Sequence, residues 1–166
     1  MSTVTFKGTP FKLAGTFPSV GQQAPNFKLA AGDLSDKQLA DFKGKTVILS
    51  IVPSLDTPVC AISAQKFNEA VSKRDNVVMI NVSADLPFAQ GRFCESKALR
   101  NIVTLSTFRS PTFGTDYGIQ LAEGPLAGLM ARAVIVIAPT GKITYVELVP
   151  EIAQEPNYDA ALAPIN

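Results

Sequence analysis

The residues best suited to covalent chemistry in this chain are its two cysteines, Cys60 and Cys94. A cysteine thiolate is a strong nucleophile, and after oxidation it can form a disulfide with a second thiol. The chain contains no histidine, which excludes Cys–His and Ser–His pairs and removes the common nitrogen ligand of zinc sites. Two cysteines can then form a structural disulfide or a redox pair, or they can be two inert buried thiols.

The segment before Cys60 predicts a helix start that holds the thiol in its first turn. Thr57 is a residue type favoured at the N-cap, and Pro58 is favoured at the first helical position. The free N–H groups and the dipole of a helix N-terminus favour negative charge. An ordinary cysteine is only ~3% ionised at neutral pH, so we expect this position to raise the thiolate fraction of Cys60. From residue types alone, an ordinary capped helix with a small buried cysteine is an equally good interpretation.

Hydrophobic patterns predict the elements that position this segment. Continuous apolar runs at residues 46–52, 77–83, 133–137 and 143–149 are typical of strands buried on both faces. The last two runs flank a Pro/Gly-containing turn and are expected to pair antiparallel. Residues 4–13 alternate around a Gly/Pro turn, which predicts a hairpin, and residues 27–30 predict a short strand.

Helices are expected at residues 58–73 and 87–99, with shorter ones at 36–42, after Pro111 and near 158–163. In the first of them, Cys60, Ala64, Phe67 and Val71 are spaced to share one face. This order of strands and helices, followed by a hairpin, predicts an α/β fold with a mixed sheet. The length of 166 residues, without a repeat or a linker, predicts one domain over residues 1–166.

Composition and charge exclude several other classes of protein. A chain that is 46% hydrophobic and 17% charged has a normal globular balance. Its formal net charge of +1, without a basic run, gives no electrostatic footprint for nucleic acid. No apolar run approaches the ~20 residues that cross a bilayer, so no membrane association is expected. The N-terminus lacks a secretory signal pattern, which predicts a cytoplasmic location and makes a purely structural disulfide the less expected use of the cysteines.

The spacing Pro53-x-x-x-Thr57-x-x-Cys60 resembles the active-site motif of the peroxiredoxins. Further segments resemble the thiol peroxidase subgroup, the atypical two-cysteine branch of that family, and they lie at residues 83–94, 105–109, 124–129 and 131–134. The resemblance covers essentially the whole chain. It implies a thioredoxin-like fold with a mixed central sheet flanked by helices and an N-terminal β-hairpin.

The resemblance also implies a role for each matching residue. Cys60 matches the peroxidatic cysteine, which becomes a sulfenic acid, and Cys94 matches the resolving cysteine. Thr57 matches the residue whose hydroxyl orients thiolate and peroxide, and Pro53 the proline that shields the sulfur from water. Arg132 matches the active-site arginine. Without the resemblance, Arg132 is most simply a surface or ion-paired residue, and Cys94 is most simply part of the core.

The implied function is a thiol-dependent peroxidase that reduces hydrogen peroxide and organic hydroperoxides through an intrachain Cys60–Cys94 disulfide. Thioredoxin is the implied reductant, the implied assembly is a homodimer, and no metal or other cofactor is needed. A disulfide requires Cα atoms within about 7 Å, and the two cysteines are expected on separate helices. The first turn around Cys60 and the helix that carries Cys94 are therefore expected to loosen locally during turnover. Two alternatives remain, a peroxide-sensing redox relay that oxidises a partner protein and a non-enzymatic thioredoxin-fold binding module.

Overall fold

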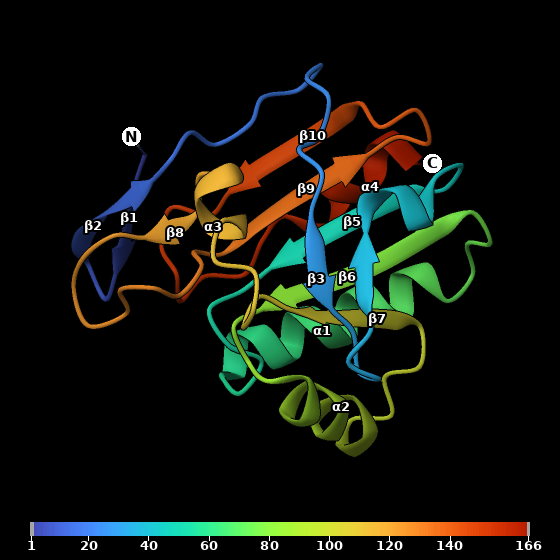
Figure 1. Cartoon of the computed structure of the whole chain (residues 1–166), viewed down its shortest axis with the longest axis horizontal. Helices are drawn as coiled ribbons and strands as arrows, with labels where there is room; N and C mark the ends of the chain where they lie inside the picture. The colour runs from blue at the N-terminus through green and yellow to red at the C-terminus, as the bar shows by residue number, and fades with distance from the viewer. Residues whose placement is uncertain (1, 166) are drawn as a thin grey trace.

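A seven-stranded mixed sheet forms the centre of the molecule in the computed structural model, which describes residues 2–165 (Figure 1). Its strand order is β10-β9-β5-β6-β7-β3-β4. The three strands β5, β6 and β7 run parallel, and the other neighbours pair antiparallel. The strand bounds are β3 Lys28–Ala30, β4 Asp36–Gln38, β5 Thr46–Ile51, β6 Val77–Ser83, β7 Ile102–Ser106, β9 Ala133–Ile137 and β10 Ile143–Leu148.

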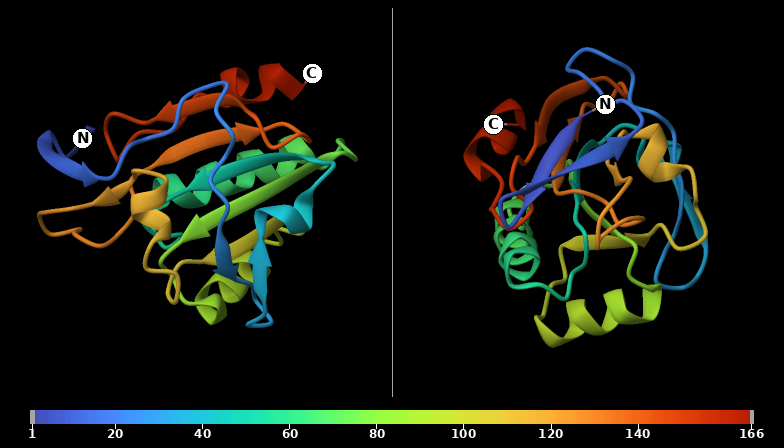
Figure 2. Two further views of the ribbon diagram at one scale, coloured as in Figure 1. Left: turned by 45° about the horizontal axis from the view of Figure 1, so that its top comes forward. Right: turned by 90° about the vertical axis from the view of Figure 1, so that its left-hand side faces the viewer.

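Helices cover both faces of this sheet, as the right-hand view of Figure 2 shows. Helices α1 (Pro58–Val71) and α4 (Tyr158–Leu162) pack on one face, against apolar side chains of β5, β6 and β9. The short helices η1 (Leu39–Phe42) and α3 (Phe113–Asp116) contribute to the core on the other face. Helix α2 (Pro87–Ser96) packs along β7, and η2 (Ala163–Ile165) follows α4. Within residues 2–165, no helix has the length and apolar character needed to cross a membrane.

The N-terminal hairpin joins a second, smaller sheet at one end of the molecule (Figure 1). Strands β1 (Thr3–Phe6) and β2 (Thr9–Ala14) pair antiparallel, and β2 also pairs with β8 (Gln120–Leu121). Lys7 and Gly8 connect β1 and β2 with positive φ angles of 52° and 81°, the backbone that a type I′ turn requires. The hairpin therefore forms as predicted, and its apolar side packs on residues that precede β9 and follow β10.

Most of the predicted elements are confirmed, including the mixed sheet, the antiparallel β9–β10 pair and both long helices. The predicted helix over residues 36–42 is wrong in its first half. There, Asp36–Gln38 extend the sheet edge by pairing with β3, and only Leu39–Phe42 are helical. Strands β7 and β8 were not predicted, because β7 carries threonine and serine among its apolar residues and β8 spans only two residues.

Candidate active site

Cys60 is the third residue of α1, and its side chain has no exposed surface. The helix begins as predicted, with Thr57 in an extended conformation at the N-cap and Pro58 as the first helical residue. The residues predicted to share one helix face are all buried. Around the sulfur lie the buried side chains of Val52 and Leu55 and the partly buried Phe93 of α2. The thiol therefore lies in an apolar cluster at a helix N-terminus.

Arg132 is the charged group beside the thiol. Its Nη2 donates a hydrogen bond to Sγ of Cys60 at 3.1 Å, and its Nε donates to the backbone carbonyl of Ile152 at 2.8 Å. The arginine is only 3% exposed, and no salt bridge joins it to a carboxylate within residues 2–165. Its Nη1 is buried without a hydrogen-bond partner in the same part of the chain. The guanidinium is therefore a buried charge with the sulfur of Cys60 as a direct neighbour.

Main-chain hydrogen bonds fix the position of Arg132. Its carbonyl accepts from the N–H of Val149 at 3.0 Å, and the carbonyl of Ile152 accepts its Nε. The N–H of Ile152 in turn donates to the carbonyl of Thr5 in β1 at 2.9 Å. The carboxylate of Glu151 accepts a hydrogen bond from the Thr5 hydroxyl. The N-terminal hairpin is thus part of the framework that holds the guanidinium against Cys60.

Thr57 and Pro53 lie in the turn between β5 and α1. Thr57 occupies the N-cap position, but its side chain does not cap the helix, because its Oγ1 donates to the carbonyl of Ser54 at 3.2 Å. The threonine is partly buried, and Pro53 is buried. Within residues 2–165, Thr57 makes no hydrogen bond to the sulfur of Cys60. Both residues therefore lie in the loop before Cys60, as the sequence predicts. The Thr57 hydroxyl, however, bonds to the Ser54 carbonyl and not to a free N–H group of the helix, as a capping threonine would.

Cys94 lies near the end of α2, partly buried, and burial raises the pKa of its thiol. Both cysteines are free thiols on separate helices, as expected for the reduced protein. The neighbour of Cys94 in the chain, Phe93, packs against the Cys60 cluster. Helix α2 therefore contacts the surroundings of Cys60 through Phe93.

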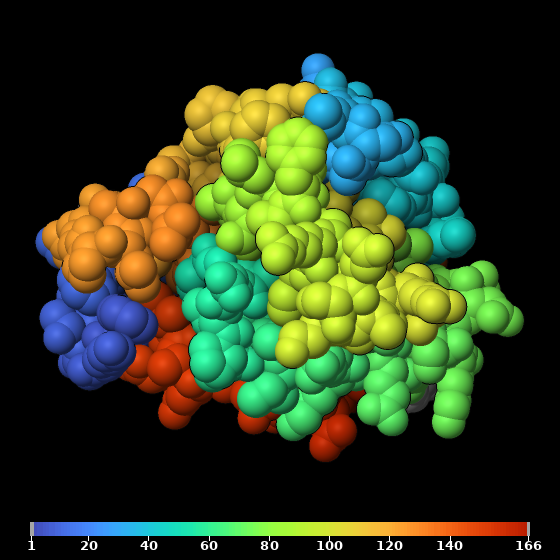
Figure 3. Space-filling view, turned by 90° about the horizontal axis from the view of Figure 1, so that it is seen from below, coloured from blue at the N-terminus to red at the C-terminus, as the bar shows by residue number. Residues whose placement is uncertain are grey.

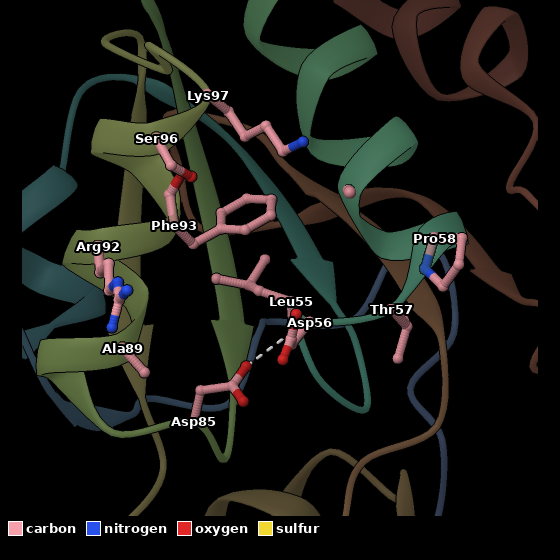
Figure 4. Close-up of a pocket in the computed structure, with 11 residues that line it drawn as sticks. Leu55, Asp56, Thr57, Pro58, Asp85, Ala89, Arg92, Phe93, Ser96 and Lys97 are labelled. Atoms are coloured by element: carbon pink, nitrogen blue, oxygen red, sulfur yellow. Dashed lines mark hydrogen bonds between the residues drawn. The ribbon is translucent and has the colours of Figure 1, made fainter.

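An open groove of about 780 Å³ separates the start of α1 from α2. Figure 4 shows the side chains that line it, and Figure 3 shows the outer surface of this face, where α1 and α2 lie side by side. One side of the groove is formed by the start of α1 and by the loop between β5 and α1, residues 52–57, which we call the Cys60 loop. The other side is formed by α2 and by Asp85, shortly after the end of β6. The lining residues are Leu55, Asp56, Thr57, Pro58, Ala61, Asp85, Ala89, Arg92, Phe93, Ser96 and Lys97.

Sequence reasoning assigned no role to Asp85, although the structure makes it the centre of a hydrogen-bond network. Its Oδ1 accepts from the Ser54 hydroxyl at 2.8 Å, and its Oδ2 accepts from the N–H of Leu55 at 2.7 Å. This carboxylate joins the loop before Cys60 to the segment after β6. In the sequence, Asp85 lies between a buried strand and a predicted helix start. An aspartate in such a place is typical of an ordinary turn, so the sequence alone does not indicate its role.

Comparisons with known proteins identify the family and the fold of the chain. The family model for redoxins matches residues 19–162. Thiol peroxidases of Mycobacterium tuberculosis and Mycobacterium bovis are each 50% identical over 163 residues, which cover 98% of this chain and 98% of each relative.

Solved structures show the same fold. A peroxiredoxin-like protein from Aquifex aeolicus is 43% identical and superposes with a TM-score of 0.94, covering 99% of this chain and 96% of that one. A thiol peroxidase from Chromobacterium violaceum is 22% identical, has a TM-score of 0.91 and covers 98% of this chain and 94% of that one. The expected thioredoxin-like fold is therefore confirmed. The chain belongs to the redoxin family, within the thiol peroxidase subgroup of the peroxiredoxins, and is a thiol-dependent peroxidase.

Proposed function

We propose that this peroxiredoxin reduces hydrogen peroxide and organic hydroperoxides by a cycle that oxidises Cys60 and then Cys94. The observation that carries the proposal is the 3.1 Å hydrogen bond from the buried Arg132 guanidinium to Sγ of Cys60. A fixed cation at this distance stabilises a thiolate in a site from which water is excluded. The helix N-terminus adds its free N–H groups to the same effect.

In the first step the Cys60 thiolate attacks one oxygen of the hydroperoxide, and the O–O bond breaks. The sulfur becomes a sulfenic acid, and the other oxygen leaves as hydroxide or alkoxide and takes up a proton. Negative charge thus moves from sulfur to the leaving oxygen. Arg132 suits this transfer, because Nη2 contacts the sulfur while the buried Nη1 has no partner within residues 2–165 and can donate to an oxygen.

Thr57 and Pro53 are proposed to shape the approach to the sulfur. The hydroxyl of Thr57 donates to the Ser54 carbonyl, so its oxygen lone pairs remain available to accept the O–H of the hydroperoxide. Thr57 also lines the groove between α1 and α2, and we propose that a substrate enters from there. Pro53 is buried at the end of β5, which supports its role in keeping bulk water from the thiolate.

In the second step the Cys94 thiol attacks the Cys60 sulfenic acid, forming a disulfide and releasing water. The thiols lie on separate helices, and we propose that local opening of both segments brings their Cα atoms within the distance of about 7 Å that a disulfide requires. A dithiol protein of the thioredoxin type then reduces the disulfide by exchange. Neither step needs a metal or an organic cofactor. We also propose a cytoplasmic homodimer, on the strength of the family resemblance.

The test is rapid quenching of the reduced protein after one equivalent of hydrogen peroxide, with free thiols counted against time. We expect the wild-type protein to lose both thiols together, orders of magnitude faster than a simple thiol. Cys60→Ser should lose none on that timescale, and Cys94→Ser should lose its one thiol quickly. Wild-type thiols that react no faster than a free thiol would contradict the proposal.

A redox relay would share this sulfur chemistry, so a second measurement separates the two functions. With excess hydroperoxide, thioredoxin, its reductase and a nicotinamide reductant, a peroxidase consumes many equivalents of peroxide per protein. A relay protein would transfer its oxidation once per client protein and would turn over poorly with thioredoxin alone.

A further inference from the structure

We propose that Asp85 is a positioning residue whose carboxylate joins the Cys60 loop to the segment that begins α2. We call this link the latch. When its hydrogen bonds break, both cysteine-bearing segments are released together. The inference deepens the proposed function and rests on it, because it concerns the movement that precedes disulfide formation. It comes from a carboxylate that no step of the peroxide chemistry uses.

On the side of the loop, the carboxylate holds two successive residues. The Ser54 hydroxyl donates to Oδ1 at 2.8 Å, and the N–H of Leu55 donates to Oδ2 at 2.7 Å, a bond drawn in Figure 4. The side chain of Leu55 is 2% exposed and packs in the apolar cluster around Cys60. These bonds thus fix the chain five and six residues before the thiol.

On the side of α2, the same residue is fixed to the ends of two strands. Asp85 directly precedes Leu86, the N-cap of α2. Its Oδ2 also accepts from the Ser83 hydroxyl at 2.7 Å, and its carbonyl accepts from the Ser106 hydroxyl at 2.5 Å. Gln90, buried on α2, donates to the hydroxyl oxygen of Ser83 at 3.0 Å. One network therefore seats the first turn of α2 on the ends of β6 and β7.

The two halves of this network meet in one carboxyl group, which couples the segments. Neutral donors hold the carboxylate, and no salt bridge reaches it in the part of the chain that the structure describes. A charged acceptor strengthens each of these hydrogen bonds. Phe93 of α2 packs on the same apolar cluster as Leu55. Movement of α2 therefore also exposes the cluster that contains Cys60. The latched state favours peroxide reduction, and the released state favours closure of the disulfide.

The test compares Asp85→Asn with the wild type and with Asp75→Asn, a matched change at an exposed carboxylate in the turn after α1. Asparagine keeps the size of the side chain but loses the charge and part of its capacity to accept hydrogen bonds. In the reduced protein, hydrogen exchange should rise at both residues 54–60 and residues 86–96. Exchange at β9 and β10 should not change, which separates release of the latch from general loss of stability.

Rapid quenching after a peroxide pulse gives the chemical readout. We expect Asp85→Asn to close the disulfide at least about tenfold faster, the smallest effect of losing one hydrogen bond to a charged group, while its Cys60 oxidises more slowly. A merely structural defect would slow both steps. If Asp85→Asn does not fold, Ser54→Ala removes a single bond of the latch and should shift both steps in the same directions by a smaller factor.

Failure of the latch and failure of the proposed function give different results. If the wild-type protein forms no Cys60–Cys94 disulfide, the proposed cycle fails, and hydrogen exchange still decides the coupling. If the wild type forms the disulfide but Asp85→Asn closes it no faster, the latch is refuted. Increased exchange in only one of the two segments also refutes it.

Discussion

Replacement of Arg132 by lysine should separate the charge of this residue from its geometry. The guanidinium makes two contacts in fixed directions, from Nε to the Ile152 carbonyl at 2.8 Å and from Nη2 to Sγ of Cys60 at 3.1 Å. A lysine carries its charge on one nitrogen at the end of a flexible stem and lacks this rigid fork. Arg132→Lys therefore keeps a cation near the site but cannot satisfy both positions.

The size of the effect follows from the distance and the burial. Two opposite unit charges 3.1 Å apart interact by ~5 kcal/mol at an effective dielectric constant of about 20, and the desolvation of both buried groups offsets much of this. Because lysine retains part of the charge interaction, the expected loss is that of one hydrogen bond to a charged group, ~1.5–3 kcal/mol. This corresponds to a decrease of about 10- to 160-fold in the rate constant for Cys60 oxidation.

The assay uses the Cys94→Ser background, in which loss of the one remaining thiol reports Cys60 oxidation alone. Arg100→Lys, at an exposed arginine in the loop after α2, serves as the control. If Arg132→Lys oxidises Cys60 at nearly the wild-type rate, charge alone suffices and the argument from fixed geometry is wrong.

Two further predictions concern pH. Burial raises the pKa of the Cys94 thiol above its ordinary value, so closure of the disulfide, timed by rapid quenching, should accelerate with pH and should still be accelerating above about pH 8.5, the ordinary thiol value. A flat profile would show that Cys94 is not the attacking group. Hydrogen bonds from the Thr5 hydroxyl and the Lys7 amide lower the pKa of Glu151, so its contribution to stability is present above about pH 4.3 and is lost as pH falls through its lower folded value. The NMR chemical shift of the Lys7 amide, which donates to Glu151, should accordingly change only below about pH 4.3. Glu151→Gln should abolish this change.

Local sequence patterns were sufficient where one segment determines its own structure. Strands β6 and β9 have the predicted bounds, because their continuous β-branched and apolar residues fit a position buried on both faces. The start of α1 was predictable for a similar reason, since Thr57 and Pro58 suit the first positions of a helix regardless of what packs around them. The single domain over residues 1–166 stays a prediction.

Local sequence patterns do not predict contacts between segments that are distant in the chain. Ile51 at the end of β5 pairs with Ala133 at the start of β9, and this register brings Arg132 to the turn that leads to Cys60. Nothing near Arg132 in the sequence specifies that pairing, and its role was predicted only through family resemblance. Asp85 was missed for the same reason, because its partners Ser54 and Leu55 lie about 30 positions away in the chain.

The order of strands explains why these groups meet and which of them can move. The carboxyl ends of the parallel strands β5 and β6 and the beginning of the antiparallel β9 share one edge of the sheet. Arg132 is held there by main-chain bonds of its own strand pair and by the Ile152 carbonyl. The Cys60 loop is held largely by side chains, with Asp85 at the centre. Local opening should therefore move Cys60 away from a stationary Arg132, so formation of the disulfide should break the bond from Nη2 to Sγ and leave the guanidinium in place for the next cycle.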